Sequence, residues 1–180
     1  QDVESHDNVF RQTTARLPWL LIGMLGGIGN SMILGNFDTT FAAHPEMALY
    51  IPLIGGTGGN VGTQSSALVV QGLANSSLDS GNTFQQILKE SVVALINATI
   101  ISMLVYIYNF IRFGATATVS YSVSISLFAV VMFASIFGTL VPMTLEKLKI
   151  DPAIATGPFI SITNDIIGMM MYMGITVLLS

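Results

Sequence analysis

Long stretches without a charged residue constrain what this chain can fold into more than any other feature of its sequence. Four such stretches of 21 to 33 residues lie before Glu146, and after Asp151 the only charged residue is Asp165. Because a helix needs about 20 apolar residues to cross the hydrocarbon core of a bilayer, these stretches predict an all-α integral membrane protein. We expect five transmembrane helices, at about 17–38, 46–74, 84–112, 120–146 and 152–179.

The composition excludes several other classes of protein. Hydrophobic residues make up 52% of the chain and charged residues 9%, whereas about 25% of the residues of a soluble domain are charged. The absence of cysteine excludes a disulfide framework and a thiolate metal site. The six lysine and arginine residues are dispersed, whereas a nucleic-acid-binding surface needs them clustered. Residues 1–15 are a short polar N-terminal tail, too small to fold alone.

The basic residues predict the orientation of the helices, because cytoplasmic loops carry an excess of Lys and Arg. With the N-terminus inside, only Arg112 falls on the outer side. The inner side then holds Arg11, Arg16, Lys89, Lys147 and Lys149. We therefore expect the N-terminus inside and the C-terminus outside the cell membrane, unless a partner or a further domain decides the topology.

The segment GGTGGNVGTQ, at 55–64, is unusually polar for a transmembrane helix. It contains two overlapping GxxxG pairs, and small residues at this spacing allow helices to pack closely in lipid. Close packing does not explain the amides of Asn60 and Gln64, which share a helical face flanked by Thr63. An amide facing lipid is costly, so this face is expected to look toward protein or water. The segment suits either a packing seam or the wall of a pore, where its glycines would leave carbonyl oxygens bare.

The last predicted helix carries one acid, Asp165, about 14 residues from its start and so roughly 21 Å along the helix. Pro158 is expected to kink this helix. A carboxylate at that depth is costly unless it is protonated, paired or hydrated. No Lys or Arg lies at a matching depth, so the acid either bonds a neighbouring helix or binds a cation or a proton. Its side of the helix also carries small and polar residues, namely Gly157, Ser161, Gly168 and Tyr172, with Asn164 adjacent.

Glu90, near the start of the third predicted helix, is the second acid of interest. It is either an interfacial charge beside Lys89 or part of a pore entrance. Carboxylate, amide and carbonyl oxygens are hard ligands, which suit Mg²⁺, Ca²⁺ or Mn²⁺ over zinc or copper. One carboxylate balances a divalent ion poorly, and two chains meeting at Asp165 would supply two.

Four pieces of the sequence resemble the transmembrane domain of the MgtE magnesium channels and transporters. The two specific pieces are PLIGGTGGNVGTQSS at 52–66 and DPAIATGPFISITNDIIGMMMY at 151–172. The other two are RLPWLLIGMLGG at 16–27 and ILKE at 87–90. All four occur in the family's order, so residues 16–180 are identified as an MgtE-like five-helix cation-pathway domain.

The resemblance implies a homodimer whose ion pathway lies at the dimer interface, lined by the second and fifth helices of each subunit. Asp165 matches the pore aspartate that attracts the hydrated ion, and Glu90 matches the acid that begins the third helix. The remaining candidate metal-site residues are Gly56, Gly59, Asn60, Ser161 and Thr63, the last at a position where relatives often have Asn. Familiar bacterial members carry an N-domain and paired CBS domains that sense magnesium. About 15 polar residues precede Arg16 here, so we expect that gating mode to be lost.

The functional prediction is passive permeation of a divalent cation through the membrane, with no catalysed reaction. Mg²⁺ is the expected ion, and Ca²⁺, Mn²⁺ and Co²⁺ are the alternatives. A Na⁺- or H⁺-coupled secondary transporter of divalent metals is the second hypothesis. A third is a structural membrane protein in which Asp165 only bonds a neighbouring helix, and a fourth is an intramembrane protease with an aspartate from each of two chains.

Overall fold

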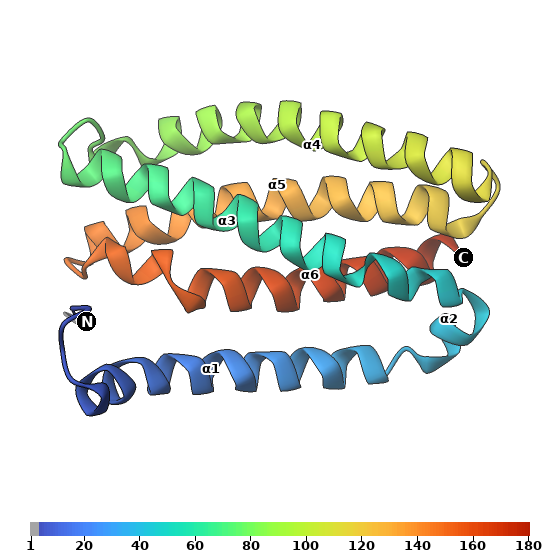
Figure 1. Cartoon of the computed structure of the whole chain (residues 1–180). Helices are drawn as coiled ribbons and strands as arrows, with labels where there is room; N and C mark the ends of the chain where they lie inside the picture. Colours follow the sequence, from blue (N-terminus) through green and yellow to red (C-terminus); the bar gives the residue numbers. More distant parts are fainter. Residues whose placement is uncertain (1–3) are drawn as a thin grey trace.

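The computed structural model describes residues 4–180, which fold as helices joined by short connections (Figure 1). The long helices are α1 (Val9–Gly35), α3 (Ile51–Ala74), α4 (Thr83–Phe113), α5 (Thr118–Lys147) and α6 (Pro158–Leu179). The short ones are α2 (Asp38–Ala43) and the 3-10 helices η1 (Pro45–Tyr50), η2 (Ser80–Asn82) and η3 (Pro152–Thr156). The all-α prediction is confirmed for the described part of the chain.

Local sequence signals set several of the helix ends. Asn8 caps α1, because its side chain accepts a hydrogen bond from the backbone N–H of Arg11 at 2.8 Å. Gly114 ends α4 with a φ of +90°, a conformation that is strained for residues with a Cβ. Pro158 occupies the start of α6, where the missing N–H of proline would have had no partner within the helix.

Several predicted boundaries are corrected by the structure. α1 begins at Val9, so residues 9–15 of the predicted tail form its first turns. The predicted span 46–74 is an α-helix only from Ile51, after η1. Pro158 starts α6 and does not kink it, because η3 and an extended Gly157 precede it. Asp165 therefore lies seven residues into its helix, roughly 10 Å along the axis.

Four of the described helices are long and apolar enough to cross a membrane: α1, α4, α5 and α6. α3 has 24 residues but is not among them, because glycine, serine, threonine and amide residues replace apolar side chains along it. The prediction of five spanning helices therefore stays a prediction.

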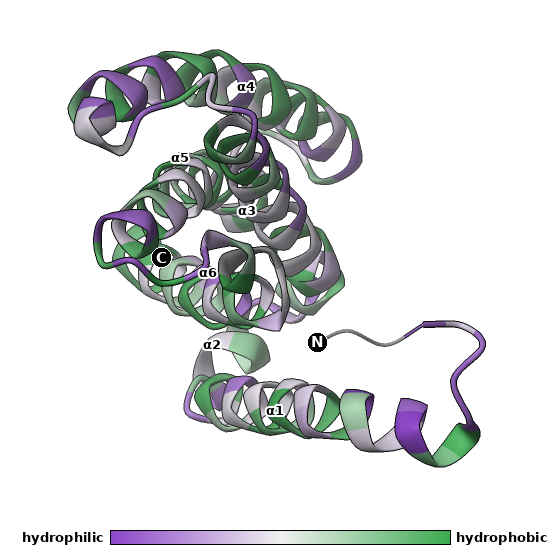
Figure 2. Ribbon diagram, turned by 90° about the vertical axis from the view of Figure 1, so that its left-hand side faces the viewer, coloured by the Kyte–Doolittle hydropathy of each residue, from purple (hydrophilic) through white to green (hydrophobic). Residues whose placement is uncertain are grey.

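The long helices run side by side and alternate in direction along the chain (Figure 1). α5 is the most buried of them and packs against α3, α4 and α6. The end-on view in Figure 2 shows that α1 lies apart from this bundle, and α1 packs mainly against α6. The residues of α1 are all at least partly exposed. The consequence is a four-helix core with one loosely attached helix.

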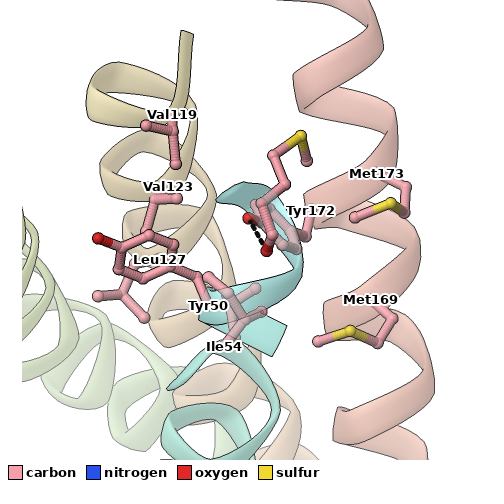
Figure 3. Packing of buried hydrophobic residues seen from close by; sticks show 10 residues of the cluster. Tyr50, Ile54, Val119, Val123, Leu127, Met169, Tyr172 and Met173 are labelled. Carbon is pink, nitrogen blue, oxygen red and sulfur yellow. Dashed lines mark hydrogen bonds between the residues drawn. The ribbon is translucent and has the colours of Figure 1, made fainter. Parts of the chain in front are cut away.

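A cluster of buried apolar residues lies where η1, α3, α5 and α6 meet (Figure 3). The hydroxyl of Tyr172 donates a hydrogen bond to the backbone carbonyl of Met47 at 2.8 Å, and the hydroxyl of Tyr50 donates to Oδ1 of Asn109. These bonds join α6 to η1 and η1 to α4 inside an apolar core. The cluster consists of Met47, Tyr50, Ile54, Val119, Val123, Leu127, Val130, Met169, Tyr172 and Met173.

Candidate cation-binding groove

A groove of about 320 Å³ lies between α3 and α6, and we call it the α3–α6 groove. Its walls carry three glycines, one amide, two hydroxyls and one carboxylate. The lining residues are Gly55, Gly56, Gly59, Asn60, Thr63, Ser161 and Asp165. The structure therefore brings six of the seven predicted metal-site residues around one groove, and Glu90 is the exception.

The two GxxxG pairs of α3 have different neighbours. Gly58 and Gly62 are buried. A Cβ on Gly58 would lie 2.9 Å from a valine methyl of α5, and one on Gly62 would collide with the side-chain amide of Asn164. This pair is a packing seam, which lets α3 approach α5 and α6 closely. Gly55 and Gly59 line the groove instead, so the segment both packs against neighbouring helices and forms a polar wall.

The backbone carbonyl groups of the glycine-rich segment belong to a helix. α3 is a continuous α-helix through 55–64, so these carbonyl groups accept the hydrogen bonds of the helical ladder. A carbonyl oxygen has two lone pairs, and the expectation that glycine carbonyls face an ion stays a prediction. The hydroxyl of Thr63 lies 2.9 Å from the carbonyl oxygen of Gly59 and 3.1 Å from that of Asn60, and it donates back into its own helix. The groove consequently offers side-chain oxygens to a cation, and the residues that carry them are Asn60, Thr63, Ser161 and Asp165.

Asp165 supplies the carboxylate of the groove. Its side chain is half-buried, and among residues 4–180 no basic side chain forms an ion pair with it. It packs against Gly55, where a Cβ would collide with Oδ1 of Asp165. Gly55 therefore makes room for the acid, although it is not among the site residues predicted from the sequence. The available signal was its i,i+4 spacing with Gly59, which places both glycines on one helical face.

Glu90 lies between α3 and α4. The hydroxyl of Ser65 donates a hydrogen bond to Oε1 of Glu90 at 2.7 Å. Glu90 is absent from the residues that line the α3–α6 groove. Its geometry is that of a link between two helices, and its predicted role at a pore entrance stays a prediction.

The polar stripe predicted on α6 is divided between two environments. Ser161 and Asp165 line the groove, whereas Gly168 and Tyr172 are buried in the bundle. Asn164 is 1% exposed, and neither polar atom of its side chain has a hydrogen-bond partner within the described residues. The division follows the packing of α6, which contacts α1, α3 and α5.

The donor set of the groove favours weak binding of a hydrated cation. Among the described residues, no group of three His, Asp or Glu side chains could hold a metal ion. One carboxylate with neutral oxygens around it can attract a cation without replacing most of its water. That suits Mg²⁺, which loses its water reluctantly and is usually held by one or two carboxylates.

Comparison with known proteins links this geometry to a family. Residues 51–175 match the family model MgtE, described as a divalent cation transporter. The chain is 31% identical over 175 residues to the magnesium transporter MgtE of Bacillus subtilis and 33% identical over 165 residues to that of Thermus thermophilus. The MgtE magnesium transporter of Enterococcus faecalis is 29% identical over 175 residues.

These alignments cover most of this chain and a smaller part of each relative. They include 97%, 92% and 97% of the chain, in the order given above, but only 39%, 36% and 38% of the relatives. The chain thus spans about two fifths of the length of the curated relatives it matches. The match includes α3 and nearly all of α6, the two helices that form the groove.

Proposed function

Because the chain belongs to the MgtE family of divalent cation transporters, we propose that it provides a membrane pathway for divalent cations, with Mg²⁺ as the transported ion. The family is one of transporters and not of enzymes, and the apolar helices α1, α4, α5 and α6 agree with a multi-pass membrane protein. The relatives are named magnesium transporters. The oxygen donors of the groove suit Mg²⁺, and they also accept Ca²⁺, Mn²⁺ and Co²⁺.

The α3–α6 groove is the observation that carries the proposal. Six water molecules at about 30 Å³ each occupy about 180 Å³, and the groove has a volume of about 320 Å³. The groove therefore has volume enough for a Mg²⁺ ion with its octahedral water shell. In the proposed pathway, Asp165 supplies the attracting charge, while Asn60, Thr63 and Ser161 bind the ion's water. Gly56 and Gly59 keep the wall free of bulky side chains.

We further propose that two copies of the chain face each other across this groove. One carboxylate leaves a divalent ion with an uncompensated positive charge in a low-dielectric region, and that is costly. A second copy would contribute a second Asp165 and would close the open side of the groove. α3 and α6 then correspond to the second and fifth predicted helices, which would line a pathway at the dimer interface.

The proposed driving force is the electrochemical gradient. A negative-inside potential favours entry of a divalent cation by about 4.6 kcal/mol per 100 mV. With the N-terminus inside, the basic side chains near the start of α1, the start of α4 and the end of α5 face the cytoplasm. No coupling ion is required for this mechanism.

The test is divalent uptake into proteoliposomes by the parent protein and by Asp165→Asn, with Mg²⁺ and Ca²⁺ measured separately. Asp165→Asn should lower uptake by at least about tenfold, the equivalent of 1.4 kcal/mol, because it removes the charge that attracts the ion. The matched control is Asp79→Asn, which makes the same chemical change at the N-cap of η2, outside the groove. Equal uptake by the parent and Asp165→Asn would remove Asp165 from the mechanism.

A second readout separates loss of the ion site from loss of the fold. Mg²⁺ that binds the folded protein should raise its melting temperature. At a Mg²⁺ concentration tenfold above the Kd, the free energy of unfolding should increase by about 1.4 kcal/mol. Asp165→Asn should fold and lose this Mg²⁺-dependent increase. If uptake stops when the Na⁺ and H⁺ gradients are removed at fixed voltage, the protein is a coupled carrier and not a passive pathway.

A further inference from the structure

A second cavity, of about 510 Å³, lies between α1 and α6 and reaches the same acid. We propose that this α1–α6 cavity binds an organic monocation with a compact apolar body, whose ammonium group lies against Asp165. The lining residues are Trp19, Leu20, Gly23, Gly26, Gly27, Pro158, Ser161, Ile162 and Asp165. The proposal concerns a different ligand and a different wall from the α3–α6 groove, and it does not depend on transport.

Glycines of α1 create the space. A Cβ on Gly26 would lie 2.5 Å from a methyl carbon of Ile162, so the two helices touch at this point. A Cβ on Gly23 or Gly27 would meet nothing within 4 Å. The cavity therefore lies beside a close helix contact, at positions where α1 has no side chain to fill it.

The lining selects for a ligand with two parts. Trp19, Leu20 and Ile162 give the cavity apolar walls, and its volume is within the range of about 300–1,000 Å³ that small-molecule sites occupy. Asp165 also lines the cavity, and its side chain is half-buried and forms no ion pair with any basic residue of 4–180. A neutral apolar occupant such as a lipid chain would take water from this carboxylate without replacing it, which is costly.

A hydrated metal ion suits this cavity poorly, because the apolar walls cannot bind its water. A compact organic ammonium ion suits it better, since its body buries apolar surface and its charge pairs with the carboxylate. The indole of Trp19 adds an aromatic surface to the wall, against which the apolar body of the ligand would pack. Charge complementarity at Asp165 and an apolar wall along α1 therefore point to the same class of ligand.

Asp165 and Ser161 line both the cavity and the α3–α6 groove. An ammonium group bound at Asp165 would occupy the acid that the proposed function assigns to the divalent ion. We therefore expect such a ligand to inhibit Mg²⁺ uptake. This inhibition rests on the proposed function, whereas binding of the ligand at the α1–α6 cavity does not depend on it.

Trp19 is the chain's single tryptophan, so the protein's tryptophan fluorescence comes from one side chain on the wall of this cavity. The probes are 1-aminoadamantane, a cation at neutral pH, and 1-adamantanol, a neutral molecule with the same cage. The protein is placed in liposomes of zwitterionic phosphatidylcholine, which add no tryptophan to the sample and do not concentrate the amine by charge. We expect a saturable change of Trp19 fluorescence with the amine and at least about tenfold weaker binding of the alcohol.

Three substitutions test the assignment. Gly23→Leu and Gly27→Leu each place a side chain in the open space, and each should weaken amine binding by at least about tenfold. Asp165→Asn should remove the preference for the amine over the alcohol. Gly29→Leu is the control, because its added side chain also enters open space on α1 but outside the lining residues. Using two cavity-filling variants keeps the test decisive if one of them does not fold.

The outcomes separate this proposal from the proposed function. Equal binding of amine and alcohol, or parent-like amine binding in both cavity-filling variants, would overturn the α1–α6 site. Amine binding as expected, together with no Mg²⁺ uptake by the parent protein, would count against the proposed function alone. Loss of amine inhibition in Gly23→Leu with uptake preserved would support both.

Discussion

Asp165 and the glycines around it decide the chemistry of this protein at the level of single residues. The carboxylate packs against Gly55 on α3 and lies between two spaces, one toward α3 and one toward α1. Without an ion pair among the described residues, it depends on water, a bound cation or a proton for stabilisation. The missing side chain at Gly55 is as important for this arrangement as the acid itself, since a methyl group would displace the carboxylate.

The glycines of the bundle should differ sharply in what they tolerate. A Cβ on Gly138 of α5 would lie 2.6 Å from the backbone oxygen of Gly62, and backbone cannot rotate away. We expect Gly138→Ala to lower the free energy of unfolding by about 1–3 kcal/mol, through overpacking of the α3–α5 contact. A Cβ on Gly56 would meet nothing within 4 Å, so Gly56→Ala should leave stability unchanged or slightly raised.

The difference in stability between Gly138→Ala and Gly56→Ala is measured by thermal unfolding in detergent, with size-exclusion chromatography as the readout of folded protein. Gly56→Ala serves as the matched control, because the same methyl group is added on a neighbouring helix. Equal destabilisation by both substitutions would mean that helix flexibility, and not the α3–α5 contact, sets the requirement for glycine.

α3 shows at the level of one element how a helix can be central to a membrane bundle without being strongly apolar. Gly58 and Gly62 pack against α5 and α6, Gly55 and Gly59 line the groove, and Ser65 bonds Glu90 of α4. These contacts use small and polar residues, which explains why α3 is not among the helices that are apolar enough to cross a membrane. A helix that meets protein and a polar groove on most of its surface has less need of apolar side chains.

The bond between Ser65 and Glu90 should hold α3 to α4. We expect a double-mutant cycle of Ser65→Ala and Glu90→Ala to give a coupling energy of about 0.5–1.5 kcal/mol. The value should be modest because Glu90 is partly exposed. The cycle is measured by thermal unfolding in nanodiscs, with Ser91→Ala in place of Ser65→Ala as the control pair, since the Ser91 hydroxyl bonds within its own helix. A coupling energy indistinguishable from the control would assign Glu90 another role.

The whole molecule is a packed bundle of α3 to α6 with α1 at its side (Figure 2). α1 carries no buried residue, and many apolar side chains of α1 and α4 are exposed. In water such a surface would aggregate, whereas in a bilayer it is solvated by lipid. The α3–α6 groove is polar and open in this single chain, and a polar surface of that kind needs water or a partner chain to cover it.

If two copies face each other across the groove, a reporter on its wall should meet its equivalent in the partner. The chain has no cysteine, so Gly56→Cys introduces a single thiol at an open position of the groove. We expect a short bis-maleimide to convert most of this variant to a covalent dimer in nanodiscs. Leu104→Cys, on the exposed surface of α4, should remain monomeric under the same conditions. Cross-linking of Leu104→Cys but not of Gly56→Cys would place the dimer interface elsewhere.

Much of the fold was predictable from local sequence because hydrophobic length is a local property. The charge-free stretches predicted the long helices, and each one appears within the described residues, with shifted ends at Val9, Ile51 and Pro158. The ends were harder to predict, since a proline can kink a helix or begin one. At Pro158 the structure shows a helix start, preceded by Gly157 in an extended conformation.

The sequence alone determined the helical class, the polarity of 55–64 and the presence of one acid in an apolar helix. It also predicted six residues that the structure gathers around one groove, because family resemblance and helical periodicity both identify a helix face. Tertiary structure decided which helix each face meets. It placed Glu90 beside Ser65, and it buried Gly168 and Tyr172 in the core. It also packed Asp165 against Gly55 and formed the cavity along α1. Those features depend on where two helices touch and where they separate. The sequence pattern of one helix does not predict its distance from a neighbouring helix.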